Sequence, residues 1–184
     1  FAGDHPDVFV SLNNMAYSLR STGRIAEAEE PLRQAVDMAR RLFKGDHALL
    51  ADTLGNLALL MMKLGRPADA LPPATEARDM QRRLFGPTSR ESADALVTLT
   101  GVLMALDRKD QAEPLLRELL GLLDAQHPGD HSRKAGAMAH LARCINAHPN
   151  PAARAEALDL ARRAADMAAR ILPEGQAVRT RCEK

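Results

Sequence analysis

The stretch G3-D-H-P-D-V-F-V-S-L-N-N-M-A16 returns, with substitutions, as G45-D-H-A-L-L-A-D-T-L-G-N-L-A58, 42 residues further along the chain. Gly-Asp-His occurs once more at residues 129–131, 84 residues after its second copy. Leucine occupies one position in three copies, at Leu12, Leu54 and Leu96. A fixed period of this length is typical of repeat architectures, in which each repeat is one unit of supersecondary structure.

Each repeat predicts two helices, because its apolar residues recur at helical spacing. On the first helix of the first repeat they are Leu12, Met15, Ala16 and Leu19. On the second helix they are Ala28, Leu32, Ala35 and Met38. We expect helices over residues 7–21, 25–43, 48–63, 67–85, 90–106, 109–126, 131–147 and 152–171. They form one domain, 1–172, of repeats 3–44, 45–86, 87–128 and 129–172, followed by a polar tail, 173–184.

Short turns separate the two helices of a pair. Gly23 and Gly65 can adopt the left-handed conformation that ends a helix, and Asp107 takes their place in the third repeat. A longer turn, A147-H-P-N-P-A152, replaces this one in the fourth repeat. Proline removes a backbone donor, so we expect local bends in the second helices at Pro31, Pro72, Pro73 and Pro114.

A single pair of these helices cannot bury both of its apolar faces, so neighbouring pairs must stack. Small residues would let the two helices of a pair cross closely, as at Ala16 with Ala28 and at Ala58 with Ala70. The predicted fold is therefore all-α, a right-handed α-solenoid of about four stacked antiparallel helix pairs. The first helices of successive pairs would line its concave surface.

Composition narrows the class of protein. The 184 residues are 46% hydrophobic and only 3% aromatic, and the formal net charge of +1 comes without a basic run. We therefore expect neither a nucleic acid nor a membrane as partner, and the longest apolar run, residues 57–62, is too short to span a bilayer. Two cysteines, Cys144 and Cys182, indicate free thiols in the cytoplasm. Because the chain begins at Phe1, we expect a piece of a longer protein.

G23-R-I-A-E-A28 and P31-L-R-Q-A35, with G3-D-H-P-D-V8 and L12-N-N-M-A16, resemble tetratricopeptide repeats. The resemblance is to the 42-residue variety of kinesin light chains and many bacterial signalling proteins. It covers roughly residues 1–172 and is strongest in the first two repeats. It implies binding rather than catalysis, because such domains hold an extended or helical segment of another protein in the concave groove.

In the light-chain type, asparagines of the first helices hydrogen-bond the backbone of the bound peptide. The matching residues here are Asn13, Asn14 and Asn56, with Thr98 and His140 as weaker replacements. Helical spacing extends the predicted groove to Tyr17, Arg20, Leu59, Met62, Lys63, Val97, Met104 and Arg143. Two alternatives stay open: Asn14 and Asn56 could bridge adjacent repeats, and the apolar residues could belong to the core. Of the adjacent pair we expect Asn13 to be the more open to solvent, because Gly55 replaces it in the next repeat.

Histidines and the first cysteine do not predict a metal site. His140, Cys144 and His148 lie along one helical face but span about 12 Å, too far for one ion to bind all three. His5, His47 and His131 share one position between repeats, so we expect a structural role for them. No phosphate-binding loop, nucleophile elbow or catalytic carboxylate pair is present. We expect neither an enzyme nor a cofactor.

The favoured hypothesis is a protein-interaction module that binds a peptide or partner helix in its concave groove. The alternative is an intramolecular regulatory or sensor segment of a larger multidomain signalling protein, packed against flanking domains of the same chain. A self-assembling structural solenoid is a third possibility.

Overall fold

The computed structural model describes residues 4–126, 129, 131–147 and 150–171. Within these residues every regular element is a helix, and consecutive helices inside each of two compact units pack against one another. The prediction of an all-α fold built from helix pairs is confirmed. The chain divides into two compact units, of which the first ends at Leu106 and the second begins at Asp107.

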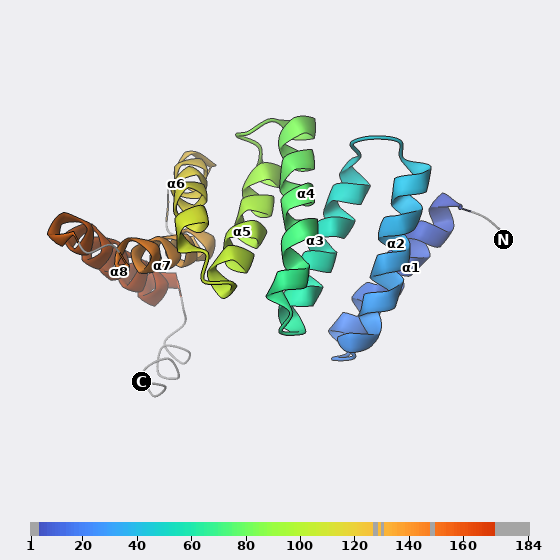
Figure 1. The fold of residues 1–184 in the computed structure, drawn as a ribbon, viewed down its shortest axis with the longest axis horizontal. Coiled ribbons are helices and arrows are strands. Elements are labelled where there is room, and N and C mark those ends of the chain that lie inside the picture. Colours follow the sequence, from blue (N-terminus) through green and yellow to red (C-terminus); the bar gives the residue numbers. More distant parts are fainter. Residues whose placement is uncertain (1–3, 127–128, 130, 148–149, 172–184) are drawn as a thin grey trace. The chain divides into compact units, whose positions relative to one another are not determined.

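The first unit holds two complete helix pairs and the first helix of a third. Its elements are α1 (Pro6–Ser21), a 3-10 turn η1 (Ala26–Ala28), α2 (Glu29–Leu42), α3 (Ala48–Lys63), α4 (Pro67–Phe85) and α5 (Arg90–Ala105). In Figure 1, α2 and α4 lie in front of α1 and α3, so the first and the second helices of the pairs form two layers. Each helix packs against the next one in the chain, and α3 also contacts α5.

The second unit contains α6 (Lys109–Gln126), α7 (Ser132–Ile145) and α8 (Pro151–Ile171). Helix α7 packs against both of the others. The side chain of Lys134 on α7 is almost fully buried and pairs with Asp124 of α6. His148, part of the turn between α7 and α8, and the predicted tail 173–184 lie outside the described residues.

Histidine caps the first helix of three repeats. His5, His47 and His131 each accept a hydrogen bond at Nδ1 from the backbone N–H two residues later, at 3.2 Å. Ser89 occupies the same position in the third repeat, and its hydroxyl accepts from the N–H of Ser92 at 3.1 Å. These bonds satisfy donors that the helix start leaves unpaired. The predicted structural role of the three histidines is confirmed.

The turns within pairs use the left-handed conformation. Gly23, Gly65 and Asp107 have φ of 80°, 71° and 54°, and Asp107 is the one residue other than glycine with positive φ in the described part of the chain. The predicted start of the second helix needs correction in the first repeat, where η1 precedes α2 and places Pro31 in the first turn of the α-helix. A first turn needs no intrahelical donor from proline. Pro72 and Pro73 lie inside α4, and Pro114 lies inside α6.

Replacing Gly65 with alanine should lower the free energy of unfolding by about 1–2 kcal/mol, the cost of a left-handed conformation for a residue with a Cβ. The added Cβ would meet no atom within 4 Å, so the loss is conformational rather than steric. Urea denaturation followed by circular dichroism measures it. The matched variant Gly121→Ala, in open space on α6, should instead gain up to about 1 kcal/mol. Equal effects of the two changes would contradict this account.

Small buried residues lie where the two helices of a pair cross, as predicted. Ala16, Ala28, Ala58 and Ala70 are all almost completely buried. Met15 departs from the prediction, because it is 54% exposed although it belongs to the apolar face of α1. At the same repeat position Leu57 is buried, since α2 of the preceding pair packs on α3. No helix pair precedes α1 in the part of the chain that the structure describes.

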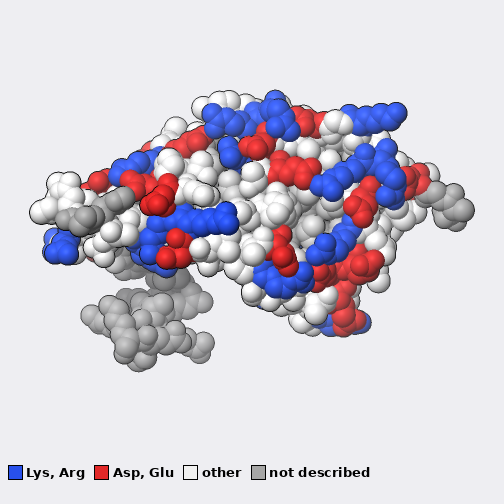
Figure 2. Space-filling model, viewed as in Figure 1, with Lys and Arg blue, Asp and Glu red and all other residues white. Residues whose placement is uncertain are grey.

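Ion pairs tie consecutive repeats together in the first unit. Arg40 of α2 binds Glu76 of α4 at 2.7 Å, and Arg66, just before α4, binds Glu29 of α2 at 2.8 Å. Figure 2 shows Lys and Arg side chains beside Asp and Glu side chains over α2 and α4, so charges of both signs mix on this layer. Exposed pairs of this kind contribute little stability each and favour one register of stacking.

Candidate peptide-binding face

Most of the predicted groove residues of the first unit are exposed or half-buried on α1, α3 and α5, and we call these residues the first-helix face. Asn14, Tyr17, Leu59 and Lys63 are exposed on α1 and α3. Tyr17 is 72% exposed, the highest value among the large apolar residues that the structure describes. Half-buried members of the face are Arg20, Asn56, Met62, Val97 and Thr98.

The two adjacent asparagines of α1 have opposite environments. Asn13 is half-buried, donates from Nδ2 to the carbonyl of Phe9 at 3.1 Å, and has Oδ1 3.4 Å from the hydroxyl of Thr53 on α3. Asn14 is exposed, and no described residue forms a hydrogen bond with its side chain. The expectation that Asn13 is the more open was wrong, because Thr53 of the next repeat lies against it. Asn14 therefore keeps both a donor and an acceptor for a ligand.

Asn56 lies one repeat after Asn14, and part of its hydrogen-bonding capacity is already used. Its Oδ1 accepts from Nη1 of Arg20 at 3.5 Å, a long contact that joins α1 to α3. The side-chain oxygen of Asn56 therefore bridges adjacent repeats, as the second interpretation of this residue predicts. Its amide nitrogen has no acceptor among the described residues.

Met104 does not belong to the open face. It is 6% exposed and lies in the part of α5 that also buries Val102 and Leu103. For Met104 the core alternative is the correct one.

A pocket of about 320 Å³ lies between α3, α4 and α5, and we call it the α3–α5 pocket. It contains three predicted residues of the first-helix face, Asn56, Leu59 and Thr98. Small residues leave this space free, namely Ala51, Gly55, Ala74, Ala77 and Ala95. Three further polar residues complete its lining, Asp52, Gln81 and Asp94.

The polar groups of the α3–α5 pocket are mostly acceptors. Nε2 of Gln81 donates to Oδ1 of Asp52 at 2.8 Å, and this bond lowers the pKa of that carboxyl. Burial has the larger effect and raises the pKa of Asp52, and the charges of Glu91 and Asp94 raise it further. Gln81 is only 7% exposed, and its Oε1 has no hydrogen-bond partner among the described residues.

The sequence contains signals for these three residues that helical periodicity alone does not reveal. Asp52 and Asp94 are 42 residues apart, and each precedes a predicted groove residue, Asn56 or Thr98, by four. Gln81 occupies the repeat position of Ala39 and Leu123, which are both buried. Apolar core residues fill this position in other repeats, so a buried amide there indicates a role other than packing.

In the second unit, the predicted residues His140 and Arg143 lie on α7. His140 is half-buried, and its pKa is lowered by burial and then by the charge of Arg143, which is exposed. Cys144 is buried, and burial raises the pKa of its thiol. Within the described residues no group of three or more His, Cys, Asp or Glu side chains is placed to hold a metal ion.

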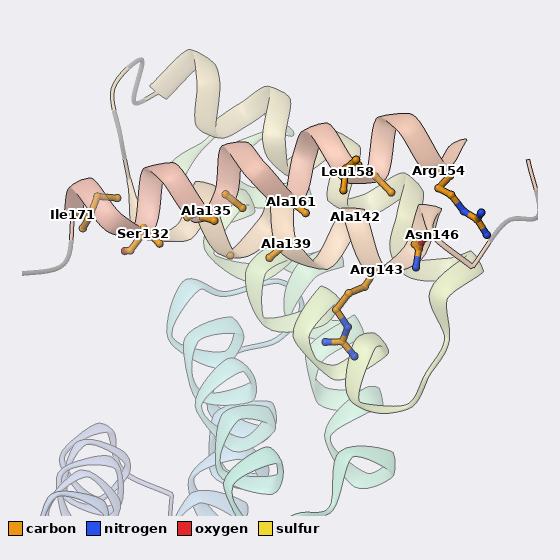
Figure 3. A pocket seen from close by; sticks show the side chains of 15 residues that line it. Ser132, Ala135, Ala139, Ala142, Arg143, Asn146, Arg154, Leu158, Ala161 and Ile171 are labelled. Carbon is orange, nitrogen blue, oxygen red and sulfur yellow. The ribbon is translucent and has the colours of Figure 1, made fainter. Parts of the chain in front are cut away.

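Figure 3 shows a second hollow, between α7 and α8, with a volume of about 930 Å³. Alanines from both helices form most of its lining, among them Ala135, Ala139, Ala142 and Ala161. Arg143, Asn146 and Arg154 lie towards one end of the groove in this view. This alanine lining suits apolar side chains, and it offers few polar groups that could distinguish one apolar side chain from another.

The repeated helix pair and the capped first helices define a helical-repeat protein. The family model for the tetratricopeptide repeat matches residues 7–83 and 49–125, and the chain belongs to this family. Tetratricopeptide repeats are generally protein-interaction modules. Comparison with curated proteins finds no match.

Solved structures share this fold. The TPR-like repeats of a putative kinesin light chain from Podosopora anserina superpose with a TM-score of 0.75 at 20% identity, over 93% of this chain and 79% of that one. BtubC (BKLC) from P. vanneervenii gives 0.78 at 19% identity, over 93% and 67%. A MamA RS-1 ArsTM double mutant gives 0.57 at 17%, over 94% and 90%. The resemblance to kinesin light chain-like repeats is thereby confirmed at the level of fold.

Among the helices that the structure describes, none combines the length and the apolar composition that crossing a bilayer requires.

Proposed function

We propose that this chain is a protein-interaction module that holds an extended peptide or a partner helix along the first-helix face. The observation that carries the proposal is Asn14, an exposed amide with both hydrogen-bonding groups available, next to the exposed ring of Tyr17. Asn56 and Leu59 occupy the same repeat positions on α3, where Leu59 is exposed and the amide nitrogen of the half-buried Asn56 has no acceptor among the described residues. Exposed apolar side chains beside amides suit a partner that brings both a backbone and side chains.

An amide is well suited to recognise a peptide backbone. Each residue of an extended segment carries one N–H donor and one C=O acceptor, and both need partners when the segment is covered. Asparagine supplies a donor and an acceptor from one short side chain. The half-buried Met62 adds an adaptable apolar contact, which accommodates side chains of different shape.

The test uses binders selected from a peptide library against the chain. Asn14→Ala and Asn56→Ala should each weaken binding by about 1 kcal/mol, roughly fivefold, because each removes a hydrogen bond to the ligand backbone. Fluorescence polarisation with a labelled peptide measures the affinity.

Gln34→Ala is the matched control for these two variants, since it removes an exposed amide from the other helix layer, on α2. Its affinity for the same peptide should equal that of the parent. A selected binder whose affinity is unchanged by Asn14→Ala, Asn56→Ala and Met62→Ala would show that the assignment of the face is wrong.

The predictions about regulation, location, catalysis and excluded partners rest on the sequence alone. An intramolecular regulatory role would place the bound segment in a flanking domain of the same chain, and the same face would hold it. A cytoplasmic location, the absence of catalysis and cofactors, and the absence of nucleic-acid or membrane partners also stay predictions. So does the division of 1–172 into four repeats of a single domain.

A further inference from the structure

We propose that the α3–α5 pocket binds a basic side chain, lysine or arginine, of the protein segment held on the first-helix face. The inference rests on the proposed function, since the pocket shares Asn56, Leu59 and Thr98 with that face. It adds a chemical preference that an amide contact to the backbone does not provide.

The charges around the pocket favour a cation. Its lining residues include the carboxylates of Asp52 and Asp94 and no Lys, Arg or His. Glu91, on α5, adds a third negative charge that acts on Asp52. Arg90 lies 4.0 Å from Asp94 with its side chain 76% exposed, and Arg20 reaches the oxygen of Asn56. Neither of them lines the pocket.

Gln81 provides the second, independent observation. It is more than nine-tenths buried, lines the pocket, and has an acceptor oxygen without a partner among the described residues. A buried acceptor left unpaired is costly, and the repeat position otherwise holds Ala39 and Leu123, which avoid that cost. A donor that reaches this oxygen from the pocket would satisfy it. An ammonium brings three donors and a guanidinium brings five.

The shape suits one long side chain. A volume of about 320 Å³ exceeds what a single water would need, and the alanines leave an apolar wall. Leu59, which is 40% exposed, also lines the pocket. The aliphatic stem of lysine or arginine can lie along the apolar lining while its charged end reaches the carboxylates.

The raised pKa of Asp52 reflects a site whose lining has carboxylates and no cationic side chain. Burial and the neighbouring Glu91 and Asp94 disfavour its charged form, and an entering cation would favour that form. Because the ligand prefers the deprotonated carboxylate, affinity should fall as the pH is lowered through the titration of Asp52.

The experiment uses sets of random 12-residue peptides, each with one central position held as lysine, norleucine, arginine or citrulline. Norleucine and citrulline keep the stem of lysine and arginine and lack the charge. The 184-residue chain should retain the lysine or the arginine set at least tenfold better than its neutral counterpart. Asp52→Asn, Asp94→Asn and Gln81→Leu should each reduce this preference several-fold. Gln81→Leu is expected to fold, since leucine occupies the same position at Leu123.

Asp37→Asn is the matched control, because Asp37 is exposed on α2 and does not line the pocket. It should keep the full preference. A preference for the lysine set alone identifies an ammonium site, and one for the arginine set alone identifies a guanidinium site. Equal retention of charged and neutral sets overturns this inference and leaves the proposed function standing. Retention of no set by the parent chain overturns both.

A second measurement does not depend on peptides. Titration with n-butylammonium chloride should shift the side-chain NH₂ signals of Gln81 in the nitrogen–proton NMR spectrum, and an equal concentration of n-butanol should not. Identical shifts with the two compounds, or none with either, would contradict a cation site in the pocket.

Discussion

Replacing Leu54 with alanine should lower the free energy of unfolding by about 2–5 kcal/mol, the largest loss that we expect from a single truncation. Leu54 is 1% exposed on α3, and it lies near Val36 of α2 and Pro73 of α4. Its removal would therefore loosen contacts among three helices and two repeats. Interiors are close-packed, so neighbouring side chains refill such a space only in part.

Urea denaturation, followed by circular dichroism at a helical wavelength, measures this loss. Leu49→Ala is the matched control, because Leu49 lies on the same helix but is 44% exposed. It should lose far less, since most of its side chain is already in contact with water. Equal losses for the two variants would mean that α3 does not pack between its neighbours as described.

Ala58→Leu should also be strongly destabilising, by about 1–3 kcal/mol or more, through overpacking rather than a cavity. Ala58 on α3 and Ala70 on α4 are both fully buried, and α3 and α4 pack against each other. A larger side chain at Ala58 would force the two helices apart. The effect would extend to α5, which packs on α4.

Thermal unfolding of the Ala58→Leu variant, compared with Ala68→Leu, measures this effect. Ala68 is exposed on α4, so a leucine there adds the same atoms without meeting a neighbouring helix. The midpoint of the first variant should fall by several degrees, while that of the second should stay close to the parent. A drop of the same size in both would assign the effect to leucine itself rather than to the crossing.

These stability predictions bear on the binding face as well. Gln81 is a buried polar residue at a repeat position where Ala39 and Leu123 are buried. A leucine at Gln81 would remove an unpaired acceptor, and natural proteins often keep such destabilising groups where binding requires them. Loss of the basic-residue preference without loss of stability would separate binding from folding at this residue.

Much of the fold follows from the sequence because its signals are local. The 42-residue period, the helical spacing of Leu12 and Leu54, and the glycine turns all act within a few residues of one another. Backbone dihedrals and helix caps respond to such short-range patterns, so the helix pairs and the role of His47 could be predicted. The third repeat has the same cap and the same left-handed turn with different residues, Ser89 as the cap and Asp107 in the turn.

The candidate site was predicted only in part, because exposure depends on which helix packs at each position. Asn13 and Asn14 are adjacent, and only the approach of Thr53 from α3 buries one and leaves the other open. Met104 shares its repeat position with Arg20, yet it lies in the core. Periodicity identifies a face of a helix and does not say what covers it.

The sequence alone therefore determined the class of protein, its helices and the helix layer that carries the exposed amides. The tertiary structure decided which side chains remain open, and it brought Asp52, Gln81 and Asp94 together from three helices. The physical reason is the range of the interactions: a helix forms from contacts a few residues apart, whereas a pocket forms where side chains distant in the chain leave space between them.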